Sequence, residues 1–392
     1  MPTYLTGDIA AHVPPMRLKS RATAEYGGAC PFCGGDPQRS DRFCIWMNDR
    51  PRYWCRQCGR SGPLDDLLNG TTRAAGTRYA AARVSERPRP IAAHIPAYRR
   101  LYRAVAAWAQ TNLHQPYNPE PLTYLRQRGL HEQTIRTARL GYALDDPRSL
   151  LEYLQRQHAD LLPYAEEAGV VMYRERDGAY QTHWNLQGCL VLPYLANGDV
   201  VDLRTRTFPG KGYKSLPGGY PQRGAVFPYG WDTITADCVL ITEGEFKALA
   251  VAQAYADGTL TVQAVAHPGL SYFSPEWAAH LVSRGVHVVI LGYDSQERPV
   301  ENGVPKLAPE EIWSLKHGWT LRRAGLQVMV LRLPLLPGQT KADLDAFIEQ
   351  YGPGALASVF QTVVPLTTYH RSLPPDLLEQ ARLPVPGRRR AA

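Results

Sequence analysis

The sequence predicts a multidomain α/β protein, built from a small N-terminal β domain, a mixed α+β segment and a C-terminal domain with a parallel sheet. Three observations predict this fold class. The chain has 392 residues, enough for two or three domains of ordinary size. Paired cysteines mark a short segment near the N-terminus. Apolar runs alternate with helical patterns between residues 236 and 352.

Composition narrows the class of protein further. Lys and Arg number 44 against 36 Asp and Glu, a formal net charge of +8 that suits a polyanionic partner, although solvated basic faces are also common. No apolar run approaches the roughly 18 to 20 residues of a membrane-spanning helix, and the N-terminus lacks the layout of a secretory signal. We therefore expect no membrane partner and a cytoplasmic location. Seven cysteines without an export signal favour metal binding over disulfide bonds.

Two C-x-x-C pairs predict a structural zinc site in a ribbon domain spanning residues 22–69. The pairs read "CPFC" and "CRQC", and the expected ligands are Cys30, Cys33, Cys55 and Cys58. Such gaps suit tetrahedral zinc. Between the pairs, "DRFCIWM" and "PRYWC" predict a β-hairpin. Its interleaved arginines and aromatic residues are typical of single-stranded nucleic-acid binding. An alternative explains the same pattern: the aromatic rings pack within the hairpin, and the arginines are only solvated.

The middle of the chain divides into a linker and a second domain. Residues 70–95 have few large apolar side chains and predict a flexible basic linker. Residues 96–235 begin with helical periodicity, and "PLTYLRQRGLHEQTIRTARLGYAL" predicts two short helices that end at Gly129 and Gly141. At the far end, residues 353–392 predict one more helix or strand, followed by a mostly disordered basic tail.

Residues 236–352 predict a parallel sheet covered by helices on both faces. The expected strands are the apolar runs "CVLIT", "TVQAVAH", "VHVVILGYD" and "LQVMVLRLP", and helical patterns separate them. Right-handed crossovers then bring the carboxyl ends of these strands to one edge, where such sheets carry their sites.

Acidic residues follow three of these strands. The first strand precedes Glu243 and Glu245, the third precedes Asp294, and the fourth precedes Asp343 and Asp345. Carboxylates gathered at one edge form an oxygen-rich site suited to a hard cation such as Mg²⁺. A single acid at a helix start is usually an N-cap, which remains open for Asp343. Glu245 is expected to complement the N-terminus of the helix that follows it.

Over residues 27–350 these strings resemble the DnaG-type DNA primases. "YLRQRGL" is similar to the start of their catalytic core, and the two cysteine pairs stand at the ligands of their zinc ribbon, with Cys33 in place of a histidine. "GCLVLPYLANGDVVDLRTRTFPGKGYKSLPGG" is similar to their basic β segment, although an expected arginine is replaced by glycine and cysteine at 188–189. The resemblance implies phosphate contacts by four cations: Arg204, Arg206, Lys211 and Lys214. Strand-edge cations that prevent aggregation remain the alternative.

The α/β unit resembles the TOPRIM fold of primases, topoisomerases and some nucleases. Glu243 and Gly244 match its "EG", and "KADLD" supplies Lys341, Asp343 and Asp345. The chain departs from the pattern at two positions. Gln296 replaces the second aspartate of D-x-D, with Glu297 next to it as a potential substitute, and Lys247 stands where an acidic residue is usual.

The resemblance implies a DNA primase that makes short RNA primers on single-stranded DNA from ribonucleoside triphosphates. Glu243, Asp294, Asp343 and Gln296 form its expected catalytic site, and Asp345 is a further ligand for Mg²⁺ or Mn²⁺. Lys341 is expected to hold phosphates, and two metal ions about 4 Å apart activate the 3′ hydroxyl and stabilise the leaving pyrophosphate. The chain has no P-loop, so a replicative helicase is expected as a separate partner, and the compact form suggests a mobile element. Two alternatives remain: an impaired relative that only binds single strands, and a TOPRIM nuclease.

Overall fold

A computed structural model gives the structure of the chain. It describes residues 12–20, 24–32, 34, 42–47, 51–55, 60–68, 92–174, 177–210, 212–216, 227–270, 273–301, 303–335 and 338–386. The chain divides into two compact units, Met1–Arg89 and Pro90–Ala392, each described by itself. The division falls within residues 70–95, the predicted linker, most of which lies outside the described residues.

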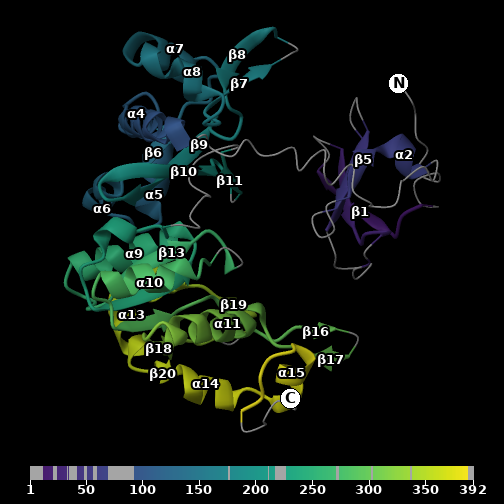
Figure 1. The fold of residues 1–392 in the computed structure, drawn as a ribbon, viewed down its shortest axis with the longest axis vertical. Helices are drawn as coiled ribbons and strands as arrows, with labels where there is room; N and C mark the ends of the chain where they lie inside the picture. Colours follow the sequence, from purple (N-terminus) through teal and green to yellow (C-terminus); the bar gives the residue numbers. More distant parts are fainter. Residues whose placement is uncertain are drawn as a thin grey trace. The chain divides into compact units, whose positions relative to one another are not determined.

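The first unit is an antiparallel sheet in the order β1-β2-β3-β4-β5. Figure 1 labels its first and last strands and the helix α2. Its elements are β1 (Met16–Ser20), β2 (Glu25–Gly28), β3 (Phe43–Trp46), β4 (Arg52–Cys55), β5 (Ser61–Pro63) and the short helix α2 (Leu64–Leu68). The predicted hairpin is confirmed, because β3 pairs with β4 in a register that sets Phe43 opposite Cys55. The rings of Phe43 and Tyr53 are buried in the core of this unit, and Trp54 is exposed.

The second unit begins with a helical and β layer. Its elements are η1 (Ala92–His94), α4 (Ile95–Leu113), α5 (Glu120–Gln127), α6 (Glu132–Thr137), β6 (Gly141–Ala143), α7 (Ser149–Gln157), η2 (Ala159–Leu161), α8 (Leu162–Ala165), β7 (Val171–Arg174), β8 (Ala179–Thr182), β9 (Cys189–Ala196), β10 (Asp199–Thr207) and β11 (Tyr213–Ser215). The sheet order is β11-β10-β9-β6, and α4 packs against β6 and β10. The basic β segment that the resemblance implies is confirmed, because β9 and β10 form an antiparallel pair there.

Gly141 has a different role from the predicted one. It does not end the second short helix, which stops at Thr137, but opens β6. A Cβ atom at this position would lie 2.6 Å from the carbonyl carbon of Ala109 in α4. Close approach of the helix to the strand therefore requires glycine here, whereas Gly129, with φ +77°, does occupy the left-handed turn after α5.

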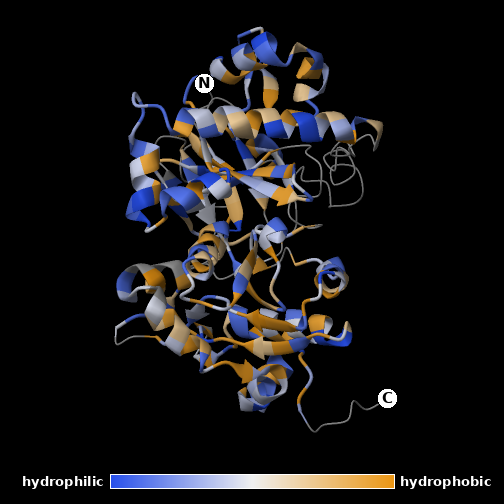
Figure 2. Ribbon diagram, turned by 90° about the vertical axis from the view of Figure 1, so that its left-hand side faces the viewer, coloured by the Kyte–Doolittle hydropathy of each residue, from blue (hydrophilic) through white to orange (hydrophobic). Residues whose placement is uncertain are grey.

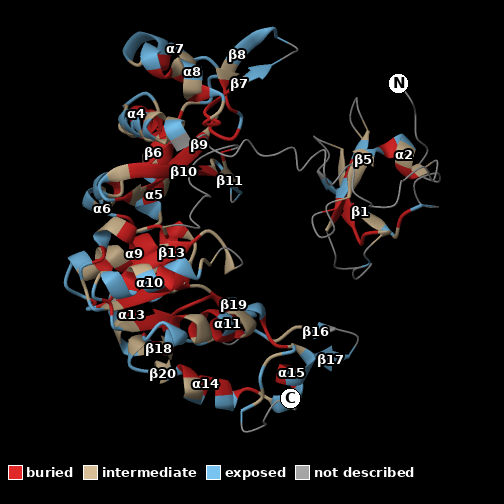
Figure 3. Cartoon of the chain, viewed as in Figure 1, coloured by how far each residue is buried: buried red, intermediate tan, exposed pale blue. Residues whose placement is uncertain are grey.

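The rest of the second unit is an α/β domain built on the strand order β13-β12-β14-β18-β20. Its main elements are η3 (Trp231–Thr233), β12 (Cys238–Glu243), α9 (Glu245–Ala256), β13 (Gln263–His267), α10 (Glu276–Ser283), β14 (Val288–Leu291), α11 (Pro309–Arg323) and β18 (Gln327–Val330). The first four strands of the sheet are parallel, as predicted. The strands β12, β13 and β14 are largely buried and mostly apolar, and the helices of this domain have mixed polarity (Figures 2 and 3).

Short antiparallel pairs lie next to the parallel sheet. β15 (Ser295–Gln296) pairs with β19 (Lys341–Ala342), and β16 (Val300–Glu301) pairs with β17 (Val304–Pro305). The first pairing sets Gln296 opposite Lys341, although 44 residues separate them. It therefore holds the segment after β14 against the segment that leads into α12 (Leu344–Tyr351).

The prediction of a mostly disordered C-terminal tail is wrong over most of the tail's length. Residues after 352 form α13 (Pro353–Phe360), β20 (Val364–Pro365), α14 (Leu366–Ser372) and α15 (Pro375–Gln380). β20 extends the sheet antiparallel to β18, and Leu366, Leu373 and Leu378 are buried in its core cluster. Prolines and arginines are frequent in this segment, and the leucines between them are buried in the core. Residues 387–392 lie outside the described residues.

Candidate active site

The acidic edge of the parallel sheet places Glu243 and Asp294 near each other. Glu243 is the last residue of β12, and Asp294 follows the neighbouring strand β14 by three residues. Gly244 then turns the chain into α9 with φ +88°, a conformation that favours glycine. Its amide donates to the carbonyl oxygen of His267 at 3.0 Å, which ties the turn to the end of β13.

Two lysines hold the Asp294 carboxylate. Lys247, in the first turn of α9, donates from Nζ to Oδ1 of Asp294. Lys341, on β19, donates to Oδ2 at 2.9 Å. The Asp294 side chain is only 11% exposed. Both of its oxygens therefore accept hydrogen bonds from ammonium groups in a partly desolvated setting.

Electrostatic coupling ties Glu243 and Asp343 to the same cluster. Burial raises the pKa of the Glu243 carboxyl, and the Asp294 charge acts in the same direction, while Lys247, Lys341 and the Leu270 amide oppose the shift. For Lys341, burial acts to lower the pKa. Its hydrogen bond to Asp294 and the charges of Asp294, Asp343 and Glu243 outweigh burial, so the pKa is raised. Three carboxylates and two ammonium groups thus share one site.

The other predicted residues of the acidic edge are placed less centrally. Gln296 is half-buried, and its backbone amide donates to Oε1 of Glu310 at 3.1 Å. The backbone amide of Glu297 bonds to Thr340. Asp345 lies in α12, and its side chain lies outside the described residues. The sequence did not identify Glu310 as a residue of this edge, because it resembles an ordinary acidic residue in the first turn of a helix. Burial raises the pKa of its carboxyl group.

The donor set of this edge fits a divalent cation. Carboxylate oxygens from Glu243, Asp294 and Asp343 are hard ligands of the kind that Mg²⁺ and Mn²⁺ prefer. The described residues contain no preformed group of three or more His, Cys, Asp or Glu ligands, and two lysines contact the Asp294 carboxylate. The three carboxylates and two ammonium groups leave one net negative charge, which matches one divalent ion more closely than two.

The first unit has half of the predicted zinc site within its described residues. Cys30 and Cys55 are both buried there, while Cys33 and Cys58 lie outside the described residues. The Cys30 sulfur accepts the Phe32 amide at 3.4 Å, and Cys30 and Gly34 exchange backbone hydrogen bonds of 2.9 and 3.0 Å. A tight turn that directs an amide towards a cysteine sulfur suits a zinc-bound thiolate.

The four predicted phosphate-binding cations have different surroundings. Arg204 is buried, and its Nη1 donates to Oε1 of Glu245 at 2.9 Å. The Tyr194 hydroxyl donates to the same oxygen at 2.7 Å. Glu245 is thus a buried partner of β9 and β10, beyond its expected position at the start of α9. Lys211 lies outside the described residues.

Arg206 is also buried, among aromatic rings. Its guanidinium lies 5.0 Å from the ring centroid of Tyr213, 5.2 Å from that of Phe246 and 5.9 Å from that of Tyr124. Nη1 donates to the Tyr213 hydroxyl at 2.8 Å. This packing fixes the guanidinium next to α9. The contact of Arg206 with a phosphate stays a prediction.

Lys214 lies beside an exposed tryptophan that the sequence interpretation missed. Trp184 is 56% exposed, and the Lys214 ammonium lies 5.4 Å from its ring centroid and 3.3 Å from its carbonyl oxygen. The His183 ring stacks on Trp184 with centroids 5.5 Å apart. A large ring kept in solvent next to a cation is unusual for packing and typical of a stacking surface. The signal in the sequence is "THWN" directly before the basic strands.

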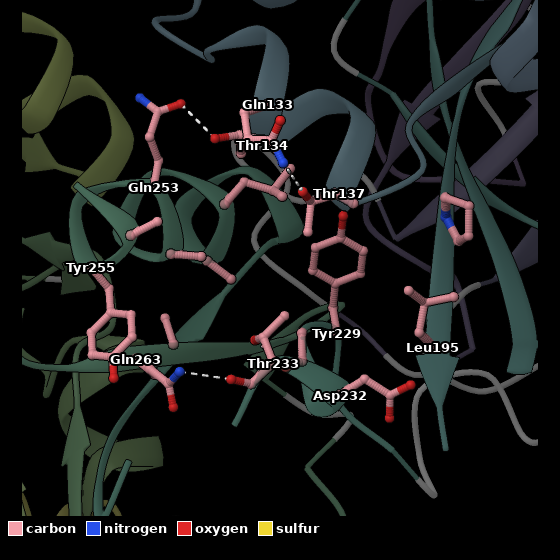
Figure 4. A pocket seen from close by; sticks show the side chains of 18 residues that line it. Gln133, Thr134, Thr137, Leu195, Tyr229, Asp232, Thr233, Gln253, Tyr255 and Gln263 are labelled. Atoms are coloured by element: carbon pink, nitrogen blue, oxygen red, sulfur yellow. Dashed lines mark hydrogen bonds between the residues drawn. The ribbon is translucent and has the colours of Figure 1, made fainter. Parts of the chain in front are cut away.

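A separate cavity of about 220 Å³ lies between α6, α9, η3 and β13 (Figure 4). Its lining is mostly apolar and includes Leu195, Tyr229 and Leu249, with none of the predicted site residues. At its rim, Oε1 of Gln253 accepts the Thr134 hydroxyl at 2.9 Å, which fastens α6 to α9. The cavity therefore belongs to the packing between two layers and lacks the charges that a phosphate ligand needs.

The chain is similar in sequence to known DNA primases. A family model described as the DNA primase catalytic core, N-terminal domain, matches residues 108–214. A DNA primase of Clostridium acetobutylicum is 23% identical over 371 residues, covering 90% of this chain and 56% of that protein. A DNA primase of Synechococcus elongatus is 28% identical over 261 residues, covering 60% of this chain and 36% of that protein.

The chain is similar to DNA primases in sequence and to DnaG primase catalytic cores in fold. It spans 56% and 36% of the length of the two curated relatives. The DnaG-type fold extends over both units: the zinc-binding and RNA polymerase domains of Aquifex aeolicus primase match with a TM-score of 0.56 and 20% identity, covering 95% of this chain and 87% of that one. A DnaG primase catalytic domain bound to single-stranded DNA matches with a TM-score of 0.54 and 18% identity, covering 71% and 82%. None of the helices in the described residues is long and apolar enough to cross a lipid bilayer.

Proposed function

We propose that this chain is a DNA primase that joins ribonucleotides into short primers on a single-stranded DNA template. The observation that carries the proposal is the position of Glu243 and Asp294 at the ends of neighbouring parallel strands, beside Lys341, within a DnaG-type fold. Edges of this kind are where open α/β sheets bind their ligands. We further propose a cytoplasmic location, a separate helicase partner and an origin in a mobile element.

Glu243 and Asp294 act as ligands of a divalent cation in this proposal, with Asp343 and the Gln296 amide oxygen near them. A bound Mg²⁺ or Mn²⁺ supplies positive charge next to the attacking 3′ hydroxyl and the leaving pyrophosphate. Lys341 is 54% exposed and is held by Asp294, so its ammonium is placed to contact phosphate oxygens of the incoming nucleotide. The protein's main contribution is position and charge, as in other phosphoryl-transfer sites.

Each unit is proposed to offer its own surface to the template: the basic strands in the second unit and the ribbon in the first. Lys214 and Trp184 offer a cation and a ring to a single strand, a combination that tracks the backbone and stacks on bases. The ribbon is proposed to hold structural zinc through its four cysteines, and its exposed Trp54 offers another ring. The buried position of Arg204 assigns it a supporting role behind this surface.

The test is a primer-synthesis assay with purified full-length protein, single-stranded DNA, the four ribonucleoside triphosphates and Mg²⁺ or Mn²⁺. We expect short RNA products that Glu243→Ala abolishes, because the variant loses a ligand of the cation. Exposed Glu276, in the first turn of α10, provides a matched control: Glu276→Ala is expected to retain synthesis. Cleaved template in place of RNA products would assign the site to a nuclease.

A second candidate function has a specific observation in its favour. The two lysines on Asp294 and the neutral Gln296 reduce the charge available to metal ions, which suits a relative that binds single strands without synthesis. Binding of single-stranded DNA that is unchanged by metal chelation and by Glu243→Ala, with no RNA product, would support this candidate and contradict the primase proposal.

A further inference from the structure

Lys247 is the strongest departure of the acidic edge from the pattern that its relatives imply. An acidic residue is expected four positions after Glu243, and this chain has a lysine there. The helix α9 begins at Glu245, so Lys247 lies in its first turn, next to the end of the strand that carries Glu243. The substitution thus places a positive charge where a metal ligand is expected.

The geometry directs this charge into the site. The Lys247 side chain is 12% exposed, and its ammonium donates to Oδ1 of Asp294. Lys341 occupies Oδ2 of the same carboxylate. A cation shared by Glu243 and Asp294 therefore has a fixed ammonium group as its immediate neighbour.

The charge of the cluster gives the same indication. Among the side chains that the structure describes, Glu243, Asp294 and Asp343 contribute three negative charges, Lys247 and Lys341 contribute two positive charges, and the balance is one negative charge. One divalent cation reverses that balance to a single positive charge, and a second would bring it to three. Gln296 adds no charge to compensate. The Lys247 and Asp294 side chains are only 12% and 11% exposed, so water screens the repulsion between a second cation and the Lys247 ammonium incompletely.

We propose that the Lys247 ammonium takes the place of one of the two divalent cations, so that this edge binds a single Mg²⁺ or Mn²⁺ ion. The inference deepens the proposed primase function and rests on it. An ammonium group is a compact point charge with three hydrogen-bond donors, and it binds phosphate oxygens well. Without nucleotide, Lys247 keeps Asp294 in place. With nucleotide bound, it provides a positive charge to the triphosphate.

The decisive measurement is the number of Mn²⁺ ions bound by the full-length, zinc-loaded protein, followed by electron paramagnetic resonance. We expect one ion per chain for the unmodified protein and two for Lys247→Asp, which restores a carboxylate at this position. Lys247→Met keeps the length of the side chain without its charge, and we expect it to bind the first ion roughly tenfold more tightly because a repelling neighbour is gone.

Primer synthesis by the same variants gives the second readout. Lys247→Met is expected to lose synthesis although it binds Mn²⁺ more tightly, since the triphosphate loses a positive charge. Lys247→Arg keeps that charge and should retain one bound ion and part of the synthesis. Exposed Lys316, on α11, supplies the matched control: Lys316→Met should change neither readout. Thermal unfolding verifies that each variant is folded.

Two bound Mn²⁺ ions in the unmodified protein would overturn the inference, and so would an unchanged Mn²⁺ affinity in Lys247→Met. If no variant makes primers, the proposed function fails, while the count of bound ions still decides whether Lys247 replaces a metal ion. The two failures are therefore distinguishable.

Discussion

Glu243 and Glu245 are two residues apart and have different surroundings. The carboxylate of Glu243 faces Asp294 and the two lysines at the sheet edge. That of Glu245 is 1% exposed and lies between Arg204 and Tyr194, inside the contact of α9 with β9 and β10. Neighbouring acids in one motif thus divide between a site and the packing that supports it.

Glu245→Ala is expected to destabilise the protein. The substitution leaves the buried Arg204 guanidinium without its carboxylate, and removing one partner of a buried ion pair costs about 3–5 kcal/mol. The free energy of unfolding in denaturant measures the effect. Glu276→Ala, an exposed acid at a helix start, should change it by less than about 0.5 kcal/mol. Equal values for the two variants would show that Arg204 does not depend on Glu245.

His317 predicts a pH dependence of stability. Burial lowers its pKa to about 3, with the charges of His267 and Lys316 acting in the same direction, and its Nδ1 lies 2.7 Å from the Tyr293 hydroxyl. In the unfolded chain this pKa is about 6.5. The unfolded state therefore binds the proton more readily, and the stability present above pH 6.5 is lost as the pH falls towards 3.

The matched variant is His317→Gln, which keeps a polar side chain near Tyr293 without titrating. The unmodified protein should be the more stable at pH 7.5, and its advantage should shrink by about 2 kcal/mol by pH 5. Urea unfolding at both pH values measures the difference. An advantage that is independent of pH would contradict a buried, neutral His317.

At the scale of elements, the basic surface depends on how the segment before β9 is fastened. The side-chain amide of Asn185 donates to the carbonyl oxygen of Ser215 in β11, and the Thr205 hydroxyl of β10 donates to the Asn185 carbonyl oxygen, both at 2.6 Å. These hydrogen bonds anchor Asn185 and so fix the backbone next to Trp184, while the Trp184 ring remains exposed to solvent. Strand pairing sets Lys214 opposite Thr205, next to the same segment.

Trp184→Ala is expected to weaken the binding of single-stranded DNA by about 1–3 kcal/mol, the range for one stacked base. Fluorescence anisotropy with a labelled oligonucleotide at several salt concentrations measures it. Tyr173→Ala removes a similarly exposed ring from β7 and should have little effect. Lys214→Ala should instead lower the salt dependence by about one phosphate contact. Equal losses for Trp184→Ala and Tyr173→Ala would contradict the assignment.

At the scale of the whole chain, the C-terminal segment belongs to the α/β domain. β20 extends its sheet, and α14 packs against α11 and β18. The leucines of α14 and α15 are buried in the same core cluster as the parallel strands. The sheet edge that would otherwise be open at β18 is therefore covered by the chain's own end.

Deleting residues 362–392 is expected to destabilise the protein strongly, because it exposes the edge of β18 and removes several buried leucines at about 2 kcal/mol each. Thermal unfolding and limited proteolysis measure the loss. Deleting residues 387–392 alone is the control and should leave the unfolding midpoint unchanged. An unchanged midpoint in the longer deletion would contradict the packing of this segment.

The sequence by itself determined the order of the elements in the α/β domain and the candidates for its site. Continuous apolar runs identify buried parallel strands, and the acids after them mark the strand ends, because both patterns are local in the chain. Glu243 and Asp294 were predicted in this way. The cysteine spacing likewise predicts the ribbon, and the hairpin between the cysteine pairs is confirmed.

Only the tertiary structure decided which partner each charged group has. The pairs Lys247–Asp294, Arg204–Glu245 and Gln296–Lys341 join residues that are 47, 41 and 45 positions apart in the sequence. Such partners depend on strand order and on how α9 packs against β10, and no local pattern encodes them. The exposure of Trp184 and the burial of the C-terminal leucines were decided in the same way. Burial depends on the elements that pack over a residue. A sequence pattern therefore gives the hydrophobic periodicity of a segment but does not show which elements pack against it.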